Sequence, residues 1–205
     1  MGMARKSKNG TLGRPRAFDA DAALDRALKV FWRKGYEGAS LSELTKAMGI
    51  NRPSLYAAFG DKKALFRKAL ERYEKGPTGF VQEALAEPTG RGMAERLLLG
   101  TAASVCGVNG NPGGCMLVQG ALAAGDSAEP VRRELAAHRQ AAATAITDRL
   151  RRAKKEGDLS ADADPAALAR YLMTVMNGMA VQSVSGATLA DLKKVAETAL
   201  SIWPE

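Results

Sequence analysis

The sequence predicts an all-α protein, in which a small amino-terminal three-helix domain with a helix-turn-helix precedes a larger helical domain. Three observations favour this fold class. Alanine, leucine and methionine are plentiful and aromatic residues make up only 5% of the 205 residues, a composition typical of helices. Apolar residues recur at helical spacing, without the strict alternation of strands over any useful length. Glycine and proline separate these segments where helices are expected to end.

The chain begins with residues 1–17, which are polar, basic and contain glycine. This composition predicts a flexible basic arm. The first helix behind the arm is capped by Asp19 and runs to about Lys34, where Gly35 ends it. Its apolar stripe consists of Ala20, Ala23, Leu24, Ala27, Leu28 and Phe31, with Trp32 beside it.

The segment 40–66 carries the most informative pattern. Ser40 and Glu43 have the spacing of a capping box, which predicts a helix directly after Ser40. Gly49 ends this helix, because glycine enters a left-handed turn without strain. Asn51 caps the next helix, and Pro53 fits its first turn, where no backbone donor is needed. Two short helices joined so tightly form a helix-turn-helix, whose second helix enters the DNA major groove.

A fourth helix is capped by Asp61 and ends near Gly76 and Pro77. This ending predicts a boundary between a domain at 18–75 and a second domain at 76–205. The segment 115–124 is apolar almost all round, so it is expected to be central and buried. The helices expected in the second domain are 80–86, 91–106, 115–124, 129–156, 165–185 and 189–203.

The positive charge of the chain is confined to its first third. The whole chain carries a net charge of +8, and residues 1–75 contain 17 Lys and Arg against 8 Asp and Glu. Residues 76–205 contain 13 basic and 14 acidic residues. A basic excess beside a helix-turn-helix predicts contact with a polyanion on that domain.

Several classes of protein do not fit the sequence. No apolar run approaches the roughly 20 residues of a membrane span, and the basic start lacks the apolar segment of a secretory signal. Two cysteines and one histidine do not make a structural zinc site. No phosphate-binding loop, dinucleotide fingerprint, paired metal ligands or nucleophile elbow is present. We therefore expect a cytoplasmic protein with reduced thiols, no cofactor and no metal, and not an enzyme.

The segment 40–66 closely resembles the DNA-binding motif of the TetR family of bacterial regulators. The pieces that match are Gly35-Tyr36, Met48-Gly49-Ile50, Ser54-Leu55-Tyr56 and Phe59-Gly60-Asp61-Lys62. The resemblance covers about the first third of the chain. Two positions depart from the usual pattern, because Ala39 stands where threonine is common and Thr45 where a small apolar residue is common.

The start of the second short helix supplies the candidate DNA contacts. Arg52 is expected to read a guanine edge; the alternative makes Arg52 a solvated charge and Tyr56 a core residue. The resemblance implies that Lys62 contacts the DNA backbone, and a helix amino terminus suits a phosphate. The arm either inserts its arginines into a minor groove of the DNA or remains a flexible tail without a DNA contact. The expected DNA-binding set is Arg14, Arg16, Ser40, Thr45, Asn51, Arg52, Pro53, Ser54, Tyr56 and Lys62.

The resemblance also implies a small-molecule effector and a homodimer for the second domain. Methionines suit irregular ligands, although each of them also fits an ordinary core. The candidate effector pocket consists of Met93, Leu97, Cys115, Met116, Met173 and Met176. Two apolar stripes at the end of the chain are expected to form the dimer interface, unless they are buried within one subunit. These stripes are Leu168, Leu172, Val175 and Met179, then Leu189, Leu192, Ala196 and Leu200.

These features predict a DNA-binding transcriptional regulator, and the resemblance implies a homodimeric repressor that a small molecule releases from operator DNA. One alternative is a thiol-sensing repressor. Cys115 is expected at a helix start, which favours the thiolate, and Cys106 across the loop would resolve an oxidised Cys115. In the commoner case both are small buried residues. A second alternative is an architectural DNA binder without an effector. His138 lies in a charged helix and is expected to be exposed.

Overall fold

The computed structural model describes residues 18–107, 110–120 and 129–204. Over these residues it contains helices and no strand, which confirms the predicted all-α class. The first four helices are α1 (Ala20–Gly38), α2 (Leu41–Met48), α3 (Arg52–Phe59) and α4 (Lys62–Lys75). They are followed by α5 (Phe80–Leu85), α6 (Gly90–Val105), α7 (Met116–Gln119), α8 (Glu129–Lys155), α9 (Pro165–Val184) and α10 (Leu189–Ser201).

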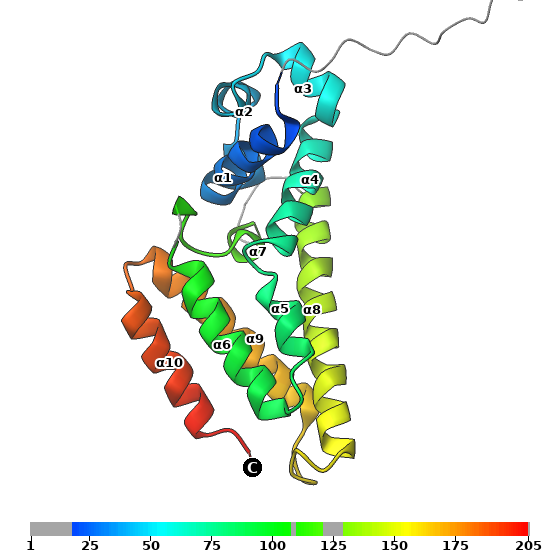
Figure 1. Ribbon diagram of the computed structural model, residues 1–205, viewed down its shortest axis with the longest axis vertical. Coiled ribbons are helices and arrows are strands. Elements are labelled where there is room, and N and C mark those ends of the chain that lie inside the picture. Colours follow the sequence, from blue (N-terminus) through cyan, green and yellow to red (C-terminus); the bar gives the residue numbers. More distant parts are fainter. Residues whose placement is uncertain (1–17, 108–109, 121–128, 205) are drawn as a thin grey trace, which may run out of the picture.

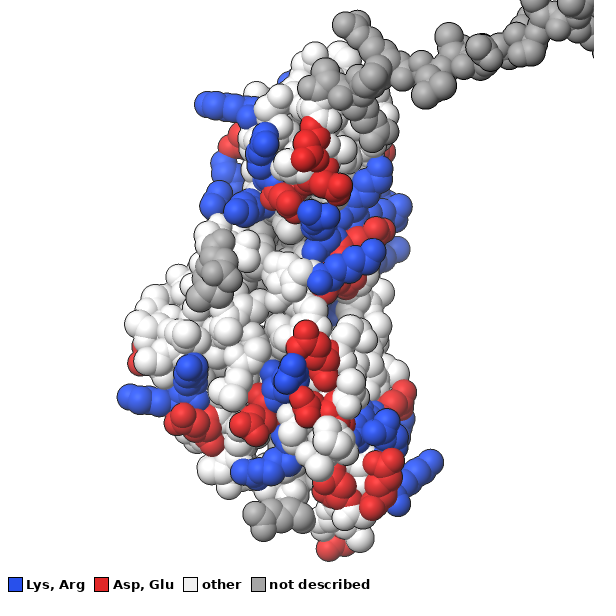
Figure 2. All heavy atoms as spheres, viewed as in Figure 1, with Lys and Arg blue, Asp and Glu red and all other residues white. Residues whose placement is uncertain are grey.

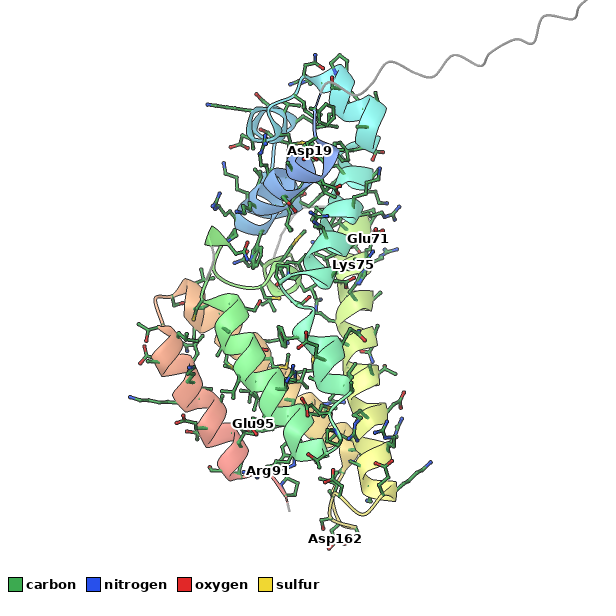
Figure 3. The ribbon with its side chains drawn as sticks, in the orientation of Figure 1. Asp19, Glu71, Lys75, Arg91, Glu95 and Asp162 are labelled. Carbon is green, nitrogen blue, oxygen red and sulfur yellow. The ribbon has the colours of Figure 1, made fainter. Side chains whose placement is uncertain are left out.

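The molecule is elongated, with α1–α4 at one end and α5–α10 at the other (Figure 1). The long helix α8 runs beside α4 and continues to the far end, near which the chain terminates (Figure 1). The lower part of α4, which carries Glu71 and Lys75, reaches the junction between the two ends (Figure 3). Along the chain, α4 therefore leads from the helix-turn-helix into the larger domain.

Helix α1 begins and breaks where the sequence predicts. The Asp19 carboxylate accepts hydrogen bonds from the backbone N–H groups of Asp21 at 2.9 Å and Ala22 at 3.1 Å. At Gly35 the backbone takes φ 68° and ψ −179°, which interrupts the helical geometry. Helical residues resume after Gly35 and continue to Gly38, so Gly35 makes a kink inside α1.

Two apolar cores hold the molecule together. The core of the α1–α4 domain contains large side chains that are almost fully buried, among them Phe31, Trp32, Leu44, Leu55 and Phe66. The core of the second domain is built around α6, which packs against α9, α10 and α5. Burial of these side chains is the main favourable contribution to folding.

The first core extends past the predicted domain boundary at residue 75. Met116 of α7 and Val131 and Leu135 of α8 belong to the same buried cluster as Trp32. The break at Gly76 and the following proline separates helices along the chain, but the packing continues across it. The helix-turn-helix domain is therefore completed by residues from the second domain.

The expectation of a long buried helix at 115–124 is wrong for its described part. The helix there, α7, is a single turn that ends at Gln119, and residues 121–128 lie outside the described part of the chain. Met116 is buried, whereas Leu117 and Val118 are only partly buried. The apolar character of this stretch arises because it faces the first core on one side and a cavity on the other.

Candidate nucleic-acid interface and effector cavity

The helix-turn-helix is shaped by the caps that the sequence predicts. The Ser40 hydroxyl accepts a hydrogen bond from the Glu43 backbone N–H at 3.2 Å, and the Glu43 carboxylate accepts one from the Ser40 N–H at 3.1 Å. Gly49 takes a left-handed conformation with φ 70°. The Asn51 side chain accepts a hydrogen bond from the Ser54 N–H at 2.9 Å. These bonds satisfy donors that helix starts otherwise leave free.

An ion pair fastens α2 to α1. Lys34 of α1 pairs with Glu43 of α2. Its ammonium group and the hydrogen bonds from Ser40 lower the pKa of Glu43 from its ordinary 4.5 to about 2. Glu43 is therefore ionised at neutral pH, and both the cap and the ion pair use this charge.

Helix α3 has one buried face and one open face. Leu55 and Phe59 point into the first core. Arg52 and Pro53 are exposed, and 49% of Tyr56 is accessible, so Tyr56 does not belong to the core. Arg52 forms no ion pair with any residue in the described part of the chain. The amino-terminal side of α3 thus presents one cation and one phenol in the arrangement that major-groove reading needs.

Lys62 stands at the start of α4, directly after the Asp61 cap. The Asp61 carboxylate accepts the Ala64 N–H at 2.7 Å. The Lys62 ammonium lies 4.6 Å from the centre of the Tyr36 ring, a geometry that attracts a cation to an aromatic face. Partial burial lowers the pKa of Lys62, and the nearby Glu37 opposes this shift. Tyr36 therefore fixes the direction of a positive charge beside a helix amino terminus.

Two of the remaining candidate DNA contacts, Ser40 and Thr45, already use their hydroxyl groups in hydrogen bonds within the protein. The Ser40 hydroxyl donates to the Glu43 carboxylate at 2.9 Å, and the Thr45 hydroxyl donates to the Leu41 carbonyl at 2.9 Å. Each hydroxyl must release this bond before it donates to a phosphate. Arg14 and Arg16 lie outside the described residues.

On the face drawn in Figure 2, basic side chains at the α1–α4 end lie mostly at its margins, with a smaller group of acidic side chains between them. Over α5–α10 basic and acidic side chains are interspersed on the same face (Figure 2). This distribution agrees with the charge counts along the sequence and concentrates the attraction for a polyanion at the helix-turn-helix end.

A cavity of about 420 Å³ lies where the two ends of the molecule meet. Side chains from α4 to α9 line it. Its wall is mainly apolar and includes Phe80, Val81, Val105, Ile146, Met173 and Met176. A concave, mostly apolar site with a few polar groups is typical of a small-molecule pocket.

Several polar groups that line the cavity form hydrogen bonds with other cavity residues. The Tyr73 hydroxyl donates to Cys115 Sγ at 3.4 Å, and Glu74 Oε1 lies 2.6 Å from His138 Nδ1. Arg139 Nη1 donates to the Leu117 carbonyl at 2.6 Å. Burial, with a smaller contribution from Cys115, raises the pKa of Tyr73, so its phenol stays protonated and keeps its donor.

The structure places half of the predicted pocket residues on the cavity wall. Cys115, Met173 and Met176 line it. Met93 and Leu97 do not, because their face of α6 points into the second core, where both are fully buried. Met116 does not line the cavity either, because it is buried in the first core.

Sequence reasoning missed the polar part of the cavity. Tyr73 and Glu74 belong to the end of α4, and no sequence signal places this end beside α8. His138 was expected to be exposed, but it is only partly accessible and faces Glu74. The contact between Glu74 and His138 is evident only once α4 and α8 are placed beside each other.

Comparison with known proteins agrees with the geometry of both sites. Residues 23–69 match the model of bacterial regulatory proteins of the tetR family, and residues 95–198 match that of the tetracyclin repressor-like C-terminal domain. The second match alone spans more than half of the chain. The chain belongs to the TetR family. It is a DNA-binding transcriptional regulator of this family.

Relatives of this TetR-family chain resemble it over nearly its whole length. The HTH-type transcriptional repressor ComR of Escherichia coli is 30% identical, over 94% of this chain and 92% of the relative. The repressor BdcR of the same organism is 32% identical, over 93% and 91%. A cysteine mutant of the TetR family regulator CifR, solved with a 26-bp operator DNA, is 43% identical and superposes with a TM-score of 0.88, over 94% of this chain and 100% of that one.

The TetR family acts as dimers, but half of the residues predicted as the interface are buried within one subunit. Leu172, Met179, Leu192 and Ala196 are at most 1% exposed within one subunit. Leu168, Val175, Leu189 and Leu200 pack against the same core. The four buried residues are covered by the core of their own chain and contact no partner, whereas the partly buried Leu168, Val175, Leu189 and Leu200 stay a prediction for the interface. The exposed apolar residues of this TetR-family subunit include Val181 and Val184 of α9 and Val195 of α10.

Two further features of this TetR-family subunit concern possible ligands and surroundings. Within the described residues, no group of three or more His, Cys, Asp or Glu side chains is arranged to hold a metal ion. None of the described helices combines the length and the apolar character needed to cross a bilayer.

Proposed function

We propose that this TetR-family regulator is a repressor that binds operator DNA through α3 and leaves it when a small molecule fills the cavity. The observation that carries this proposal is the position of α4. The helix begins with Lys62 at the DNA-binding end, and it supplies Tyr73 and Glu74 to the cavity wall near its other end. A ligand in the cavity therefore contacts the same helix that orients the helix-turn-helix.

The proposed mechanism is a change in spacing between two subunits. In a dimer, two α3 helices about 34 Å apart reach successive major grooves on one side of the DNA. A ligand that binds best when the α1–α4 ends are further apart shifts the equilibrium away from the DNA-competent state. The ligand is bound and released unchanged, and we propose no catalytic step. The cytoplasm, where the operator lies, is the proposed location.

The choice of repressor over activator rests on the relatives. ComR and BdcR are described as transcriptional repressors, and both cover more than nine-tenths of this chain. We assign the same direction of control here. For the dimer, we assign the interface to the exposed side of α9 and α10, including Val181 and Val195.

The proposal is tested with an operator that is selected from random DNA using the purified protein. A repressor should prefer this operator over random DNA by roughly 10³-fold or more, and its affinity should fall steeply with salt as Lys and Arg release counterions. Small molecules that raise the melting temperature are then tested for operator release. A specificity ratio near one would support the architectural alternative instead.

Thiol sensing remains a second candidate because of one observation. Cys115 lies on the cavity wall, with the Tyr73 hydroxyl directed at its sulfur. The second thiol is less suited, since burial raises the pKa of Cys106 and lowers its thiolate fraction. Reversible ligand binding needs neither thiol and is therefore preferred.

A further inference from the structure

Residues 114–119, called the connecting segment here, are in contact with both functional regions. The segment contains α7 and the two residues before it. It packs against α1 of the DNA-binding end and contributes Cys115, Leu117 and Val118 to the cavity. We propose that Trp32 of α1 couples the cavity to the DNA-binding end through this segment. The proposal rests on the repressor function proposed above.

On the DNA-binding side, the segment is held by a buried hydrogen bond. The Trp32 indole N–H donates to the Gly114 carbonyl at 3.1 Å, and only 1% of Trp32 is exposed. The Trp32 ring packs edge-on against Tyr73, with ring centres 4.7 Å apart. Met116 adds an apolar contact in the same core. Water does not replace a bond buried this deeply, so breaking it leaves a donor and an acceptor unsatisfied.

On the cavity side, the segment is held by two further hydrogen bonds. Arg139 of α8 donates to the Leu117 carbonyl, and Tyr73 of α4 donates to Cys115 Sγ. All four of these residues line the cavity. A molecule in the cavity therefore lies against the residues that position the segment. Two of them, Cys115 and Leu117, are within three positions of Gly114 in the chain.

The segment has little freedom to absorb a displacement. The Gly114 N–H donates to the Val105 carbonyl at the end of α6, at 2.8 Å. Gly114 has φ +80°, and its backbone packs so closely that a Cβ there would overlap the side chains of Val184 on α9 and of Gln119. Because the backbone is fixed at Gly114 and coiled into one turn behind it, movement of Cys115 or Leu117 shifts the Gly114 carbonyl. Helix α1 must follow this carbonyl or lose the Trp32 bond.

The inferred route differs from the direct one along α4. Tyr73 and Glu74 belong to α4, so a ligand that displaces them moves α4 directly. This direct route does not depend on Trp32. Trp32 makes α1 move with the cavity as well, so the two helices that support α2 and α3 respond together. Trp32 is thus a positioning residue for operator release and does not itself contact the ligand.

The test fills the cavity by mutation, so no effector has to be known. Ala145 lines the cavity from α8, and Ala145→Phe occupies part of it; Ala142→Leu is a second filler. Operator affinity is measured for each filler in the wild-type, Trp32→Phe and Trp203→Phe backgrounds. Trp203 is the other tryptophan of the chain, buried at the far end of the second core, and it provides the matched control.

We expect a filler to change operator affinity by roughly fivefold or more in the wild-type and Trp203→Phe backgrounds, the lower range of allosteric coupling. In the Trp32→Phe background, the filler should change operator affinity by about twofold or less. Because each affinity is divided by that of the unfilled protein of the same background, a change in affinity caused by Trp32→Phe alone does not affect the comparison. An undiminished change in Trp32→Phe overturns the inference and leaves the proposed function intact. No change in the wild type overturns the proposed function.

A second measurement applies if Trp32→Phe does not fold. In the Trp203→Phe protein, Trp32 is the sole tryptophan. Filling the cavity should then alter the wavelength or intensity of its emission. An emission spectrum that is identical with and without the filler contradicts the coupling through Trp32.

Discussion

Glu74, one residue before the last of α4, lies with its carboxylate 2.6 Å from Nδ1 of His138 on α8. The two residues are 64 positions apart in the sequence, and both line the cavity. Nearer the DNA-binding end, Arg67 of α4 also pairs with Glu134 of α8, at 2.8 Å. These contacts align α4 with the longest helix, so a ligand that separates Glu74 from His138 changes the angle between them.

The first prediction concerns base reading by α3. Arg52→Ala should weaken operator binding by roughly 1–3 kcal/mol and relax the preference at one base pair, because a guanidinium reads guanine through two hydrogen bonds. The measurement is a binding titration against operators that vary at each position. Arg151→Ala, at an exposed position of α8, is the control and should leave affinity unchanged. Equal weakening on every sequence would assign Arg52 to a phosphate.

Lys62 is expected to behave differently. Lys62→Ala should weaken binding to all sequences about equally and reduce the salt slope by about one unit, since a phosphate contact carries no sequence information. Tyr36→Leu, which removes the aromatic face under the ammonium, should weaken binding in the same uniform way but less. A change in base preference for Lys62→Ala would contradict this role.

The revised dimer interface gives a contrast between two kinds of substitution. Val181→Glu with Val195→Glu should give folded monomers in sedimentation experiments, because both valines are exposed in the subunit and a charge opposes their burial in an interface. Leu172→Ala, in the core, should instead lower the free energy of unfolding by roughly 2–5 kcal/mol. A double valine variant that remains fully dimeric would falsify the placement.

Acid stability should depend on Glu43. Its pKa is about 2 in the folded protein and 4.5 ordinarily. A carboxyl group whose pKa is lowered by folding stabilises the protein above its unfolded pKa, and this contribution is lost as the pH falls through the folded value. The stability difference between wild type and Glu43→Gln should therefore be constant above about pH 4.5 and shrink towards pH 2. Denaturant titrations over this range measure it, and Lys34→Gln should reduce the difference.

The thiols should be dispensable for induction. Cys115→Ser keeps a small side chain on the cavity wall that still accepts a hydrogen bond from Tyr73. We expect it to bind the operator and to respond, much like wild type, to a releasing compound found by screening. Cys106→Ser serves as the control. Release of the operator by mild oxidant or N-ethylmaleimide in wild type and in Cys106→Ser, but not in Cys115→Ser, would establish thiol sensing at Cys115.

The sequence predicted local structure better than the placement of helices. Caps such as Ser40 and Asn51 act within four residues, so their pattern is readable directly. The apolar stripes of α9 and α10 were also recognised, but the spacing of apolar residues does not indicate which surface packs against them. Leu172 and Leu192 therefore look alike whether α6 or a second subunit lies against them. The cavity depended on α4 meeting α8, a long-range contact that leaves no periodic signal.

The packing of Met116, Val131 and Leu135 against the α1–α4 core bears on how such regulators are recombined. A fragment cut after Lys75 would carry an uncovered apolar surface and lack the acceptor for the Trp32 indole. Grafting this DNA-reading unit onto another sensor therefore requires transplanting α7 and the first turns of α8 with it. Chimaeras joined at the glycine after α4 should express poorly, whereas those that retain these pieces keep their operator specificity.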